Sequence, residues 1–545
     1  MPTLHWIGKD KVINHHHDVP FKVLDHQYTF NGNSSTVIDA SPNKIIHGDN
    51  LEALKALLPE YEGKIKCIYI DPPYNTGNEH WVYNDNVNDP KIKKWLGQVV
   101  GTDNEDLTRH DKWLCMMYPR LNLLHKLLAK DGAIFISIDD NELSHLKQIM
   151  DEIFGPSNFI EYFSWIKTST APSLAKKSRK TSEYILCYEK ERNSLKYKAE
   201  IGDGGDAPLL NTGNAKIELT FPKNAVQLKL LNGKYAKGSY DKVILNNDIE
   251  IVDGYSLVDI KLIGEFKWTQ VTLNEEIKNG TTFIVKSDKF SIRYLRENEV
   301  FKAPTNLLKE KYFTTLIDKT GSGIETNEGA KKELQEIFNT HVFDYPKPTS
   351  LIKFFLNLIS DKDSIILDSF AGSGTTAHAV LNLNKDGGNR KFILIEMEDY
   401  AESITAERVK RVMKGYSGKE GTGGSFEYYE LGETLFVGEN SEYLNEAVGI
   451  EKIRNYIWYS ETRNFLVPTN QNLKEDTLLG IYHNTAYYFI YHPTRLTSLD
   501  FETLATVNVK AGQYIIYADN CLLSKDFLFR NNIVFKKIPR DISRF

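Results

Sequence analysis

The chain has 545 residues, enough for roughly three to four domains of average size. Hydrophobic residues make up 41% of it, aromatic residues 12% and charged residues 26%, a balance that excludes disordered, collagen-like and coiled-coil proteins. The 67 basic and 73 acidic residues give a net charge of −6, which argues against wrapping of nucleic acid by the whole surface but allows a local basic groove.

Two further exclusions concern membranes and metals. No apolar run approaches 18 residues, and residues 1–40 carry histidines and aspartates where a signal peptide would be apolar, so we expect a soluble, cytoplasmic protein. The four cysteines are scattered, which predicts neither a disulfide framework nor a zinc site. We interpret Asp139-Asp140 as a strand-end and helix-cap feature and His15–His17 as part of an exposed arm, so no metal site is expected.

The pattern along the chain predicts four zones. Residues 1–40 are polar and irregular and are expected to form an N-terminal arm. Residues 41–191 alternate short apolar strands with helical spacing, which is typical of a parallel α/β sheet. Residues 192–340 are β-rich and contain Asn-Gly and Asp-Gly turn signals, which indicates an inserted domain.

The α/β pattern resumes over residues 341–415, so one sheet is predicted to form from two distant stretches. A glycine-rich linker follows, and residues 416–545 are expected to form a small C-terminal α+β domain. The predicted fold class is α/β, with a doubly wound Rossmann-like sheet, an inserted β-rich domain and this C-terminal domain.

The first chemical motif is Asp71-Pro72-Pro73-Tyr74, which directly follows the apolar strand 65–70. Ligands of parallel α/β sheets bind outside the carboxyl ends of the strands, and proline offers a carbonyl without an N–H. If the Asp71 carboxylate and the Pro72 carbonyl each accept one N–H of an exocyclic base amine, the positive charge that develops as the amine attacks is stabilised. Tyr74 would stack on the base, which must leave its duplex to reach such a pocket.

The second motif runs from Asp368 to Thr376, again a strand followed by a glycine turn and a helix. Glycine lets the backbone approach a ligand closely, and Glu396 closes the next strand, where its carboxylate can accept both hydroxyls of a ribose. Ala377 stands where a dinucleotide fingerprint requires its third glycine, and no P-loop lysine follows. The hydroxyls of Thr375 and Thr376 suit an amino-acid moiety, so an adenosyl cofactor other than a dinucleotide is predicted.

With these motifs the sequence resembles the β-class amino-methyltransferases of DNA, and within them the modification (Mod) subunits of type III restriction-modification systems. Six blocks carry the resemblance in the family's order, the catalytic half preceding the cofactor half: residues 48–51, 71–77, 131–142, 182–186, 343–348 and 370–376.

The resemblance implies site residues at matching positions. Asp71, Pro72, Pro73 and Tyr74 correspond to the catalytic motif, and Lys347 flanks the methionine end of S-adenosylmethionine. Asp49 and Asn50 correspond to residues that touch the cofactor's adenine, although they also suit a helix N-cap. The cofactor loop and ribose ligand comprise Asp368, Phe370, Ala371, Gly372, Ser373, Gly374, Thr375 and Glu396.

A basic loop between residues 167 and 180 precedes the strand 184–188 and is expected to contact DNA phosphates in a salt-dependent manner. It contains Lys167, Lys176, Lys177, Arg179 and Lys180.

The resemblance implies site-specific transfer of a methyl group from S-adenosylmethionine to adenine N6 in double-stranded DNA within a bacterial cytoplasm. The expected partners are a second copy of the chain and a separate restriction (Res) subunit. Cytosine N4 methylation and an orphan methyltransferase remain alternatives, as do a dinucleotide-dependent oxidoreductase, which Ala377 disfavours, and a non-catalytic DNA-binding subunit, which the intact Asp71–Tyr74 motif disfavours. The recognised DNA sequence cannot be read from residues 192–340.

Overall fold

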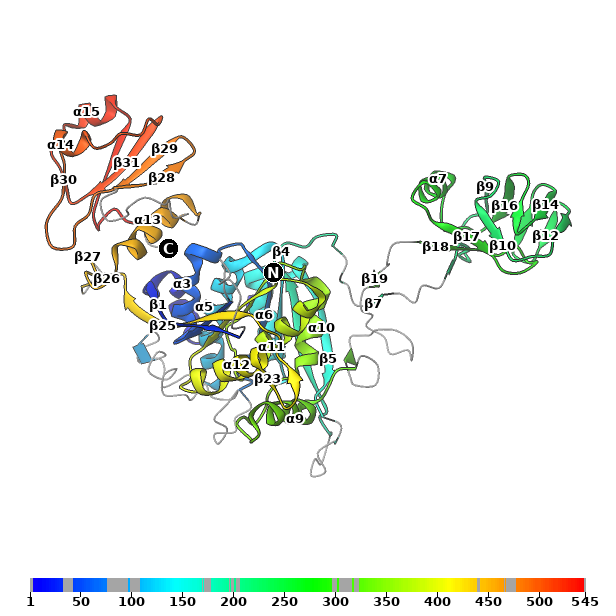
Figure 1. Cartoon of the computed structure of the whole chain (residues 1–545), viewed down its shortest axis with the longest axis horizontal. Coiled ribbons are helices and arrows are strands. Elements are labelled where there is room, and N and C mark those ends of the chain that lie inside the picture. Colours follow the sequence, from blue (N-terminus) through cyan, green and yellow to red (C-terminus); the bar gives the residue numbers. More distant parts are fainter. Residues whose placement is uncertain are drawn as a thin grey trace. The chain divides into compact units, whose positions relative to one another are not determined.

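The computed structural model divides into two compact units, Met1–Ser194 with Thr305–Phe545, and Leu195–Pro304 (Figure 1). In the described part of the chain, no helix is both long and apolar enough to cross a bilayer. The structure describes residues 3–32, 43–75, 97–98, 108–168, 170, 178–195, 197, 200–201, 206–296, 301–302, 316–317, 323–438, 442–464, 466 and 477–543.

A ten-stranded mixed sheet forms the centre of the first unit. The strands from β25 to β4 in the sheet run parallel to one another, whereas β1 and β6 pair antiparallel to their neighbours. The sheet order is β1 (Lys22–Asn31), β25 (Ser425–Thr434), β2 (Asn43–His47), β22 (Lys391–Glu396), β21 (Ile365–Asp368), β3 (Ile65–Ile70), β4 (Leu128–Ile138), β6 (Ser182–Glu189), β5 (Phe159–Ile166) and β20 (Leu316–Ile317).

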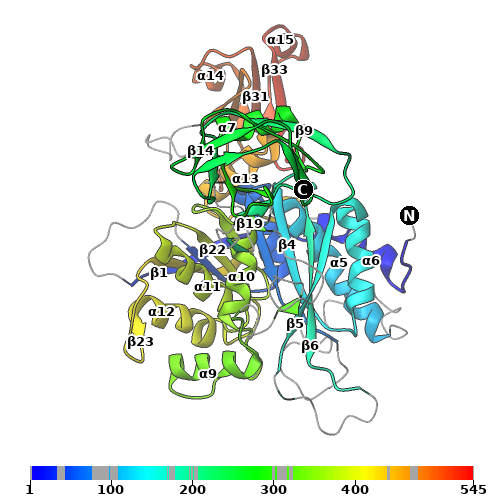
Figure 2. The same ribbon diagram turned by 90° about the vertical axis from the view of Figure 1, so that its right-hand side faces the viewer.

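Helices cover both faces of this sheet, as Figure 2 shows for β4. Ile134 and Ile136 belong to the core formed with α3, α5 and α6, whereas the intervening Phe135 packs 4.9 Å from the ring of Phe355 in α10. Adjacent residues of a strand point to opposite faces, so the two helix layers lie on opposite sides and the sheet is doubly wound. The helices are α3 (Asn50–Tyr61), α5 (Arg109–Leu127), α6 (Leu143–Phe154), α10 (Thr349–Ile359), α11 (Thr375–Leu383) and α12 (Glu407–Lys414).

The pairing of β3 with β21 places the two chemical motifs next to each other. Cys67 lies opposite Ile366 and Ile68 opposite Leu367, in parallel register, although the two strands are about 300 residues apart in the sequence. The carboxyl ends of both strands therefore reach the same edge of the sheet, where Asp71 and Asp368 lie.

Three of the predicted boundaries are wrong. Residues 3–32 are not an irregular arm, because they form α1 (Lys9–Val12), α2 (His15–Asp18) and the edge strand β1. The C-terminal part does not separate at residue 416, because β25 lies between β1 and β2 in the central sheet. The inserted unit ends at Pro304 rather than residue 340, and α9 (Asn327–Phe338) belongs to the first unit.

The C-terminal segment contains its own small sheet within the first unit. Its strands surround a local core that includes Tyr488 and Ile516, while α13 (Ile450–Thr462) joins the main core through Ile457 and Tyr459. The sheet order is β28 (Leu478–Tyr482), β29 (Thr485–Phe489), β31 (Gln513–Ala518) and β33 (Ile533–Lys537), accompanied by α14 (Phe501–Leu504) and α15 (Lys525–Arg530).

The second unit is β-rich and has a separate core, which includes Phe221, Leu262 and Phe283. Two four-stranded sheets contribute to it, together with α7 (Gln270–Lys278). They are β10 (Val226–Leu228), β17 (Thr282–Val285), β18 (Ile292–Leu295) and β8 (Ala207–Pro208), and β12 (Gly238–Tyr240), β13 (Val243–Leu245), β16 (Ile260–Gly264) and β9 (Ile217–Phe221).

Candidate active site

Asp71 directly follows β3, with its side chain 12% exposed and a partner on each carboxylate oxygen. The Lys347 ammonium donates to Oδ2 at 2.9 Å, and the Tyr74 hydroxyl donates to Oδ1 at 2.9 Å. Burial raises the pKa of the Asp71 carboxyl above its ordinary value, because desolvation outweighs the favourable charge of Lys347. The expected catalytic carboxylate is therefore fixed in orientation by two donors.

Glu183, near the start of β6, is a second buried carboxylate in this cluster. Its Oε2 lies 3.1 Å from the Tyr74 hydroxyl and 3.6 Å from the Lys347 ammonium, and its Oε1 accepts from Lys167 at 2.9 Å. Burial pushes the pKa of Glu183 upward, but the charges of Lys347 and Lys167 outweigh it, so the pKa is lowered. The cluster balances two carboxylates with two ammonium groups.

Pro73 of the catalytic motif is held by α5. The indole of Trp113, which is fully buried, donates to the Pro73 carbonyl at 2.6 Å. The next residue after Tyr74, Asn75, adopts a left-handed backbone with φ 58° and donates its amide to the Arg109 carbonyl at 3.1 Å. These contacts anchor the segment after β3 against the first turns of α5.

The cofactor loop after β21 is tied together by its own side chains. Asp368 accepts from the Thr376 hydroxyl at 2.5 Å and from the Phe370 amide at 3.0 Å. The Gly372 amide donates to Glu396 Oε2 at 2.7 Å. Gly374 has φ 79°, and a side-chain carbon there would lie 3.0 Å from the Thr405 carbonyl, so this turn requires glycine.

Both acidic side chains of this loop region are buried. Burial raises the pKa of Asp368 to about 7 and that of Glu396 to about 8. Hydrogen bonds from hydroxyl groups and contact with a cation stabilise the ionised form of a buried carboxyl. A ribose provides such hydroxyls, and an amino-acid moiety provides such a cation.

Arg408 of α12 supports the cofactor loop, and no sequence motif indicated it. Its fully buried guanidinium donates to the hydroxyls of Thr375 at 2.7 Å and Ser373 at 2.9 Å, and its other nitrogen reaches Thr349 Oγ1 at 3.2 Å. The Thr375 hydroxyl, expected to face the cofactor, is thus held by Arg408, and that of Thr376 is held by Asp368. No local motif indicates Arg408, because it lies in a helix more than 30 residues after the loop residues that it contacts.

Asp49 and Asn50 join α3 to the cofactor loop. Asp49 is the N-cap of α3 and accepts from the Leu51 amide at 2.8 Å. Asn50 donates to the Ser369 carbonyl at 3.2 Å and accepts from the buried Arg120 at 2.5 Å. The N-cap interpretation of Asp49 is confirmed, and Asn50 lies beside the loop.

A cavity connects the two motifs. Its lining contains Asp71 from the end of β3 and seven of the residues expected to hold the cofactor. Gly374, Glu396, Asp49 and Asn50 lie outside this lining, and aromatic and apolar side chains complete it. The lining comprises Tyr69, Asp71, Phe343, Tyr345, Pro346, Lys347, Ile352, Asp368, Phe370, Ala371, Gly372, Ser373 and Thr375.

The basic loop is only partly described. Lys167 is engaged with Glu183, and Lys180 pairs with Asp140. Arg179 is exposed, and Lys176 and Lys177 lie outside the described residues. Lys167 therefore belongs to the Asp71 cluster in this structure rather than to an exposed phosphate-contacting surface.

Comparison with known proteins gives the family. Residues 65–407 match the model of the N6/N4 DNA methylases. The chain belongs to this family. The match spans both strand ends that line the cavity, so the resemblance predicted from the six sequence blocks is confirmed.

The similar proteins include type III Mod subunits and a type II methyltransferase. The type III restriction-modification enzyme StyLTI Mod subunit of Salmonella typhimurium is 32% identical, over 67% of this chain and 54% of that protein. The EcoPI Mod subunit of Escherichia phage P1 is 31% identical, over 76% and 68%. The type II methyltransferase M.KpnI of Klebsiella pneumoniae is 31% identical, over 66% and 81%. The chain thus spans about half the length of StyLTI Mod.

Proposed function

We propose that this chain transfers a methyl group from S-adenosylmethionine to N6 of a flipped-out adenine in double-stranded DNA, as the modification subunit of a type III restriction-modification system. The observation that carries the proposal is the single cavity lined by both Asp71 and the Asp368–Thr375 loop. Two reactants held at neighbouring strand ends can meet without a large movement of the chain.

The cavity suits an adenosyl sulfonium. Phe370, Tyr345 and Ile352 offer aromatic and apolar surface for an adenine, and the Asp368 carboxylate favours positively charged groups. S-adenosylmethionine would supply an electrophilic methyl group there, so the protein has to orient and stabilise the amine that attacks it.

Asp71 would accept one N–H of the target amine, with the Pro72 carbonyl accepting the other. The amine's lone pair would form the new N–C bond as the sulfur–methyl bond of the bound cofactor breaks and its electron pair stays on the sulfur. The nitrogen would then shed one proton, which Asp71 can receive. Both Asp71 oxygens are engaged by Tyr74 and Lys347 in this structure, and Glu183 lies within 3.1 Å and 3.6 Å of the same two donors. Glu183 would therefore take over these donors when the amine binds Asp71.

We assign target recognition to the second unit, 195–304. The chain leaves the first unit after β6 and returns before β20, and the central sheet is complete without the insert. The catalytic motif precedes the cofactor loop in sequence, which is the permuted order of the β-class. Replacing 195–304 with a flexible linker should spare binding of S-adenosylmethionine and abolish site-specific methylation; unchanged site preference would refute the assignment.

The resemblance to Mod subunits supports a homodimer that works with a Res subunit in the bacterial cytoplasm. The match to M.KpnI favours a second candidate, a methyltransferase that acts without a restriction partner. Co-purification of a restriction subunit encoded beside this chain would distinguish the two, and light scattering would establish the number of copies.

The first test is incubation of the purified chain with labelled S-adenosylmethionine and unmethylated bacterial DNA, followed by digestion to nucleosides. We expect N6-methyladenine with the native chain and none with Asp71→Asn, whose side chain has the same size. N4-methylcytosine would instead establish the cytosine alternative. Absence of any transfer, in a protein that binds the cofactor and DNA, would refute the proposed activity for the isolated chain.

A further inference from the structure

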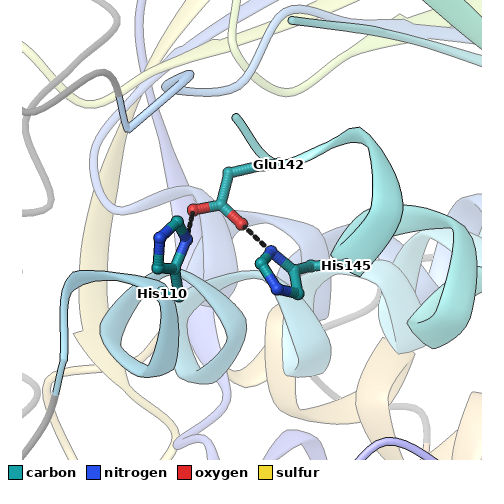
Figure 3. Close-up of side chains that lie close together, drawn as sticks. All are labelled: His110, Glu142 and His145. Carbon is teal, nitrogen blue, oxygen red and sulfur yellow. Dashed lines mark hydrogen bonds and ion pairs between the residues drawn. The ribbon is translucent and has the colours of Figure 1, made fainter. Parts of the chain in front are cut away.

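His110, Glu142 and His145 converge at the first turns of α5 and α6, as Figure 3 shows. His110 Nδ1 lies 2.6 Å from Glu142 Oε1, and His145 Nδ1 lies 2.7 Å from Glu142 Oε2. All the potential ligand atoms of this cluster, one from each side chain, lie within 4.8 Å of one another.

The charge of Glu142 needs compensation. Its side chain is fully buried, and within the part of the chain that the structure describes its ion-pair partners are these two imidazoles rather than a lysine or arginine. The other buried carboxylate near the catalytic motif, Glu183, has two lysines instead. A carboxylate buried without a fixed positive charge is costly, and a bound cation would remove that cost.

We propose that His110, Glu142 and His145 bind a divalent transition-metal ion of the zinc class. Two imidazole nitrogens and one carboxylate, with water as a fourth ligand, form a common set for such ions, whereas magnesium and calcium prefer all-oxygen sites. The site stands on this cluster alone and does not depend on the proposed methyl transfer.

Binding an ion requires these side chains to rearrange. Tetrahedral bonds of about 2.0–2.2 Å place ligand atoms roughly 3.3 Å apart. Each imidazole nitrogen would move away from the Glu142 oxygen that it contacts at 2.6 or 2.7 Å, and ligand atoms that now lie within 4.8 Å of one another would gather around the ion. The side chains of His110 and His145 are 34% and 29% exposed, which leaves both rings access to solvent and an ion a route of entry.

The ion would connect three segments. His110 belongs to α5 and His145 to α6, whereas Glu142 is the N-cap residue that precedes α6. Glu142 Oε1 also accepts the amide of Asn75, the residue after Tyr74. Ligating carboxylates are commonly held by such neighbouring donors. The site is therefore structural, tying the end of the catalytic motif to two helices. No short sequence motif indicates this cluster, because His110 lies 32 residues before Glu142.

The test uses the full-length chain, freed of metal with a chelator and titrated with Co²⁺ and then Zn²⁺. We expect one tight equivalent of Co²⁺ with the intense visible absorption of a tetrahedral site, displaced by Zn²⁺. Glu142→Gln and His145→Ala should lose this equivalent. Two controls should keep it: His341→Ala, which removes an exposed histidine that pairs with Asp344 at 2.9 Å, and His17→Gln, which alters the N-terminal histidine run.

Failure to bind a stoichiometric ion, or loss of the tight equivalent in His17→Gln, would overturn the proposal and leave the cluster as hydrogen bonds between imidazoles and a carboxylate. A further variant guards against misfolding of the others. His145→Cys keeps a ligand at the same position, and its Co²⁺ complex should show thiolate-to-cobalt charge transfer in the near ultraviolet. A folded His145→Cys protein without that band would also overturn the proposal.

Discussion

Replacing Asp71 with Asn tests the centre of the proposed mechanism, because it removes one negative charge at nearly constant shape. In the native site Asp71 Oδ2 accepts from Lys347 at 2.9 Å and Oδ1 accepts from Tyr74 at 2.9 Å. The amide keeps a single acceptor oxygen and cannot balance the positive charge that develops on the target nitrogen. Removing one preorganised electrostatic contact of this kind lowers kcat by about 10²–10³. We expect at least that loss for Asp71→Asn.

Asp71→Asn should lower the stability of the fold only moderately, because Lys347 keeps a second carboxylate nearby. Lys347 retains Glu183 at 3.6 Å, so it does not become an unpaired buried charge. We therefore expect Asp71→Asn to lose about 1.5–3 kcal/mol, the usual value of a hydrogen bond to a charged group. Lys347→Met is the informative contrast, because it leaves the Asp71 carboxylate buried without its cation, a change that costs about 3–5 kcal/mol.

Three measurements on Asp71→Asn and Lys347→Met decide the matter: kcat on DNA, the Kd for S-adenosylmethionine by calorimetry, and thermal unfolding. We expect an inactive Asp71→Asn protein whose cofactor Kd stays within about threefold of the native value, and a larger fall in Tm for Lys347→Met. A kcat within tenfold of the native enzyme would refute the role of Asp71. A tenfold change in cofactor Kd would instead assign Asp71 to cofactor binding.

Three further predictions concern the cofactor loop and DNA. Burial raises the pKa of Glu396 to about 8. We propose that ribose hydroxyls bind its ionised form, so affinity for S-adenosylmethionine should rise up to tenfold per pH unit below pH 8 and level off above it. Calorimetry on Glu396→Gln should show a flatter profile. Arg408→Lys should weaken cofactor binding by about tenfold or more, because the charge-assisted hydrogen bond to Thr375 that it removes contributes about 1.5–3 kcal/mol. Arg411→Lys, at the half-exposed ion pair with Glu407, should leave cofactor binding unchanged, and equal Kd values for the two variants would contradict this prediction. Arg179→Gln should reduce the slope of log Kd against log salt by about 1 in DNA-binding titrations, and an unchanged slope would exclude a phosphate contact.

The sequence predicted the sheet best where strands are buried on both faces. The run Ile65–Ile70 is almost entirely buried, and a continuous apolar run ending in a polar motif is readable without a structure. The edge strand β1 was missed because its residues are half-exposed or polar, as expected for a strand with one neighbour. Its partner β25 lies about 400 residues away, a distance at which no local pattern indicates pairing.

The site was predicted to the extent that its residues form contiguous motifs. Asp71 and the Asp368–Thr375 loop were found because a strand, a turn and a helix follow one another there. Glu183 and Arg408 were missed as functional candidates, since each lies within an ordinary strand or helix and acquires its partners only by tertiary packing. Lys347 was predicted, but its ammonium lies on Asp71, a contact that connects positions 276 residues apart.

The two carboxylates of the Asp71 cluster differ in a way that assigns them different roles. Burial raises the pKa of Asp71, whereas the charges of Lys347 and Lys167 overcome burial and lower the pKa of Glu183. When the pKa values of two neighbouring acids are shifted apart in this manner, the acid with the raised pKa takes up a proton and the other stays ionised. On this ordering we propose that Asp71 would receive the proton shed by the methylated amine. Glu183, remaining charged, can hold the Tyr74 hydroxyl and the Lys347 ammonium while Asp71 is occupied by substrate.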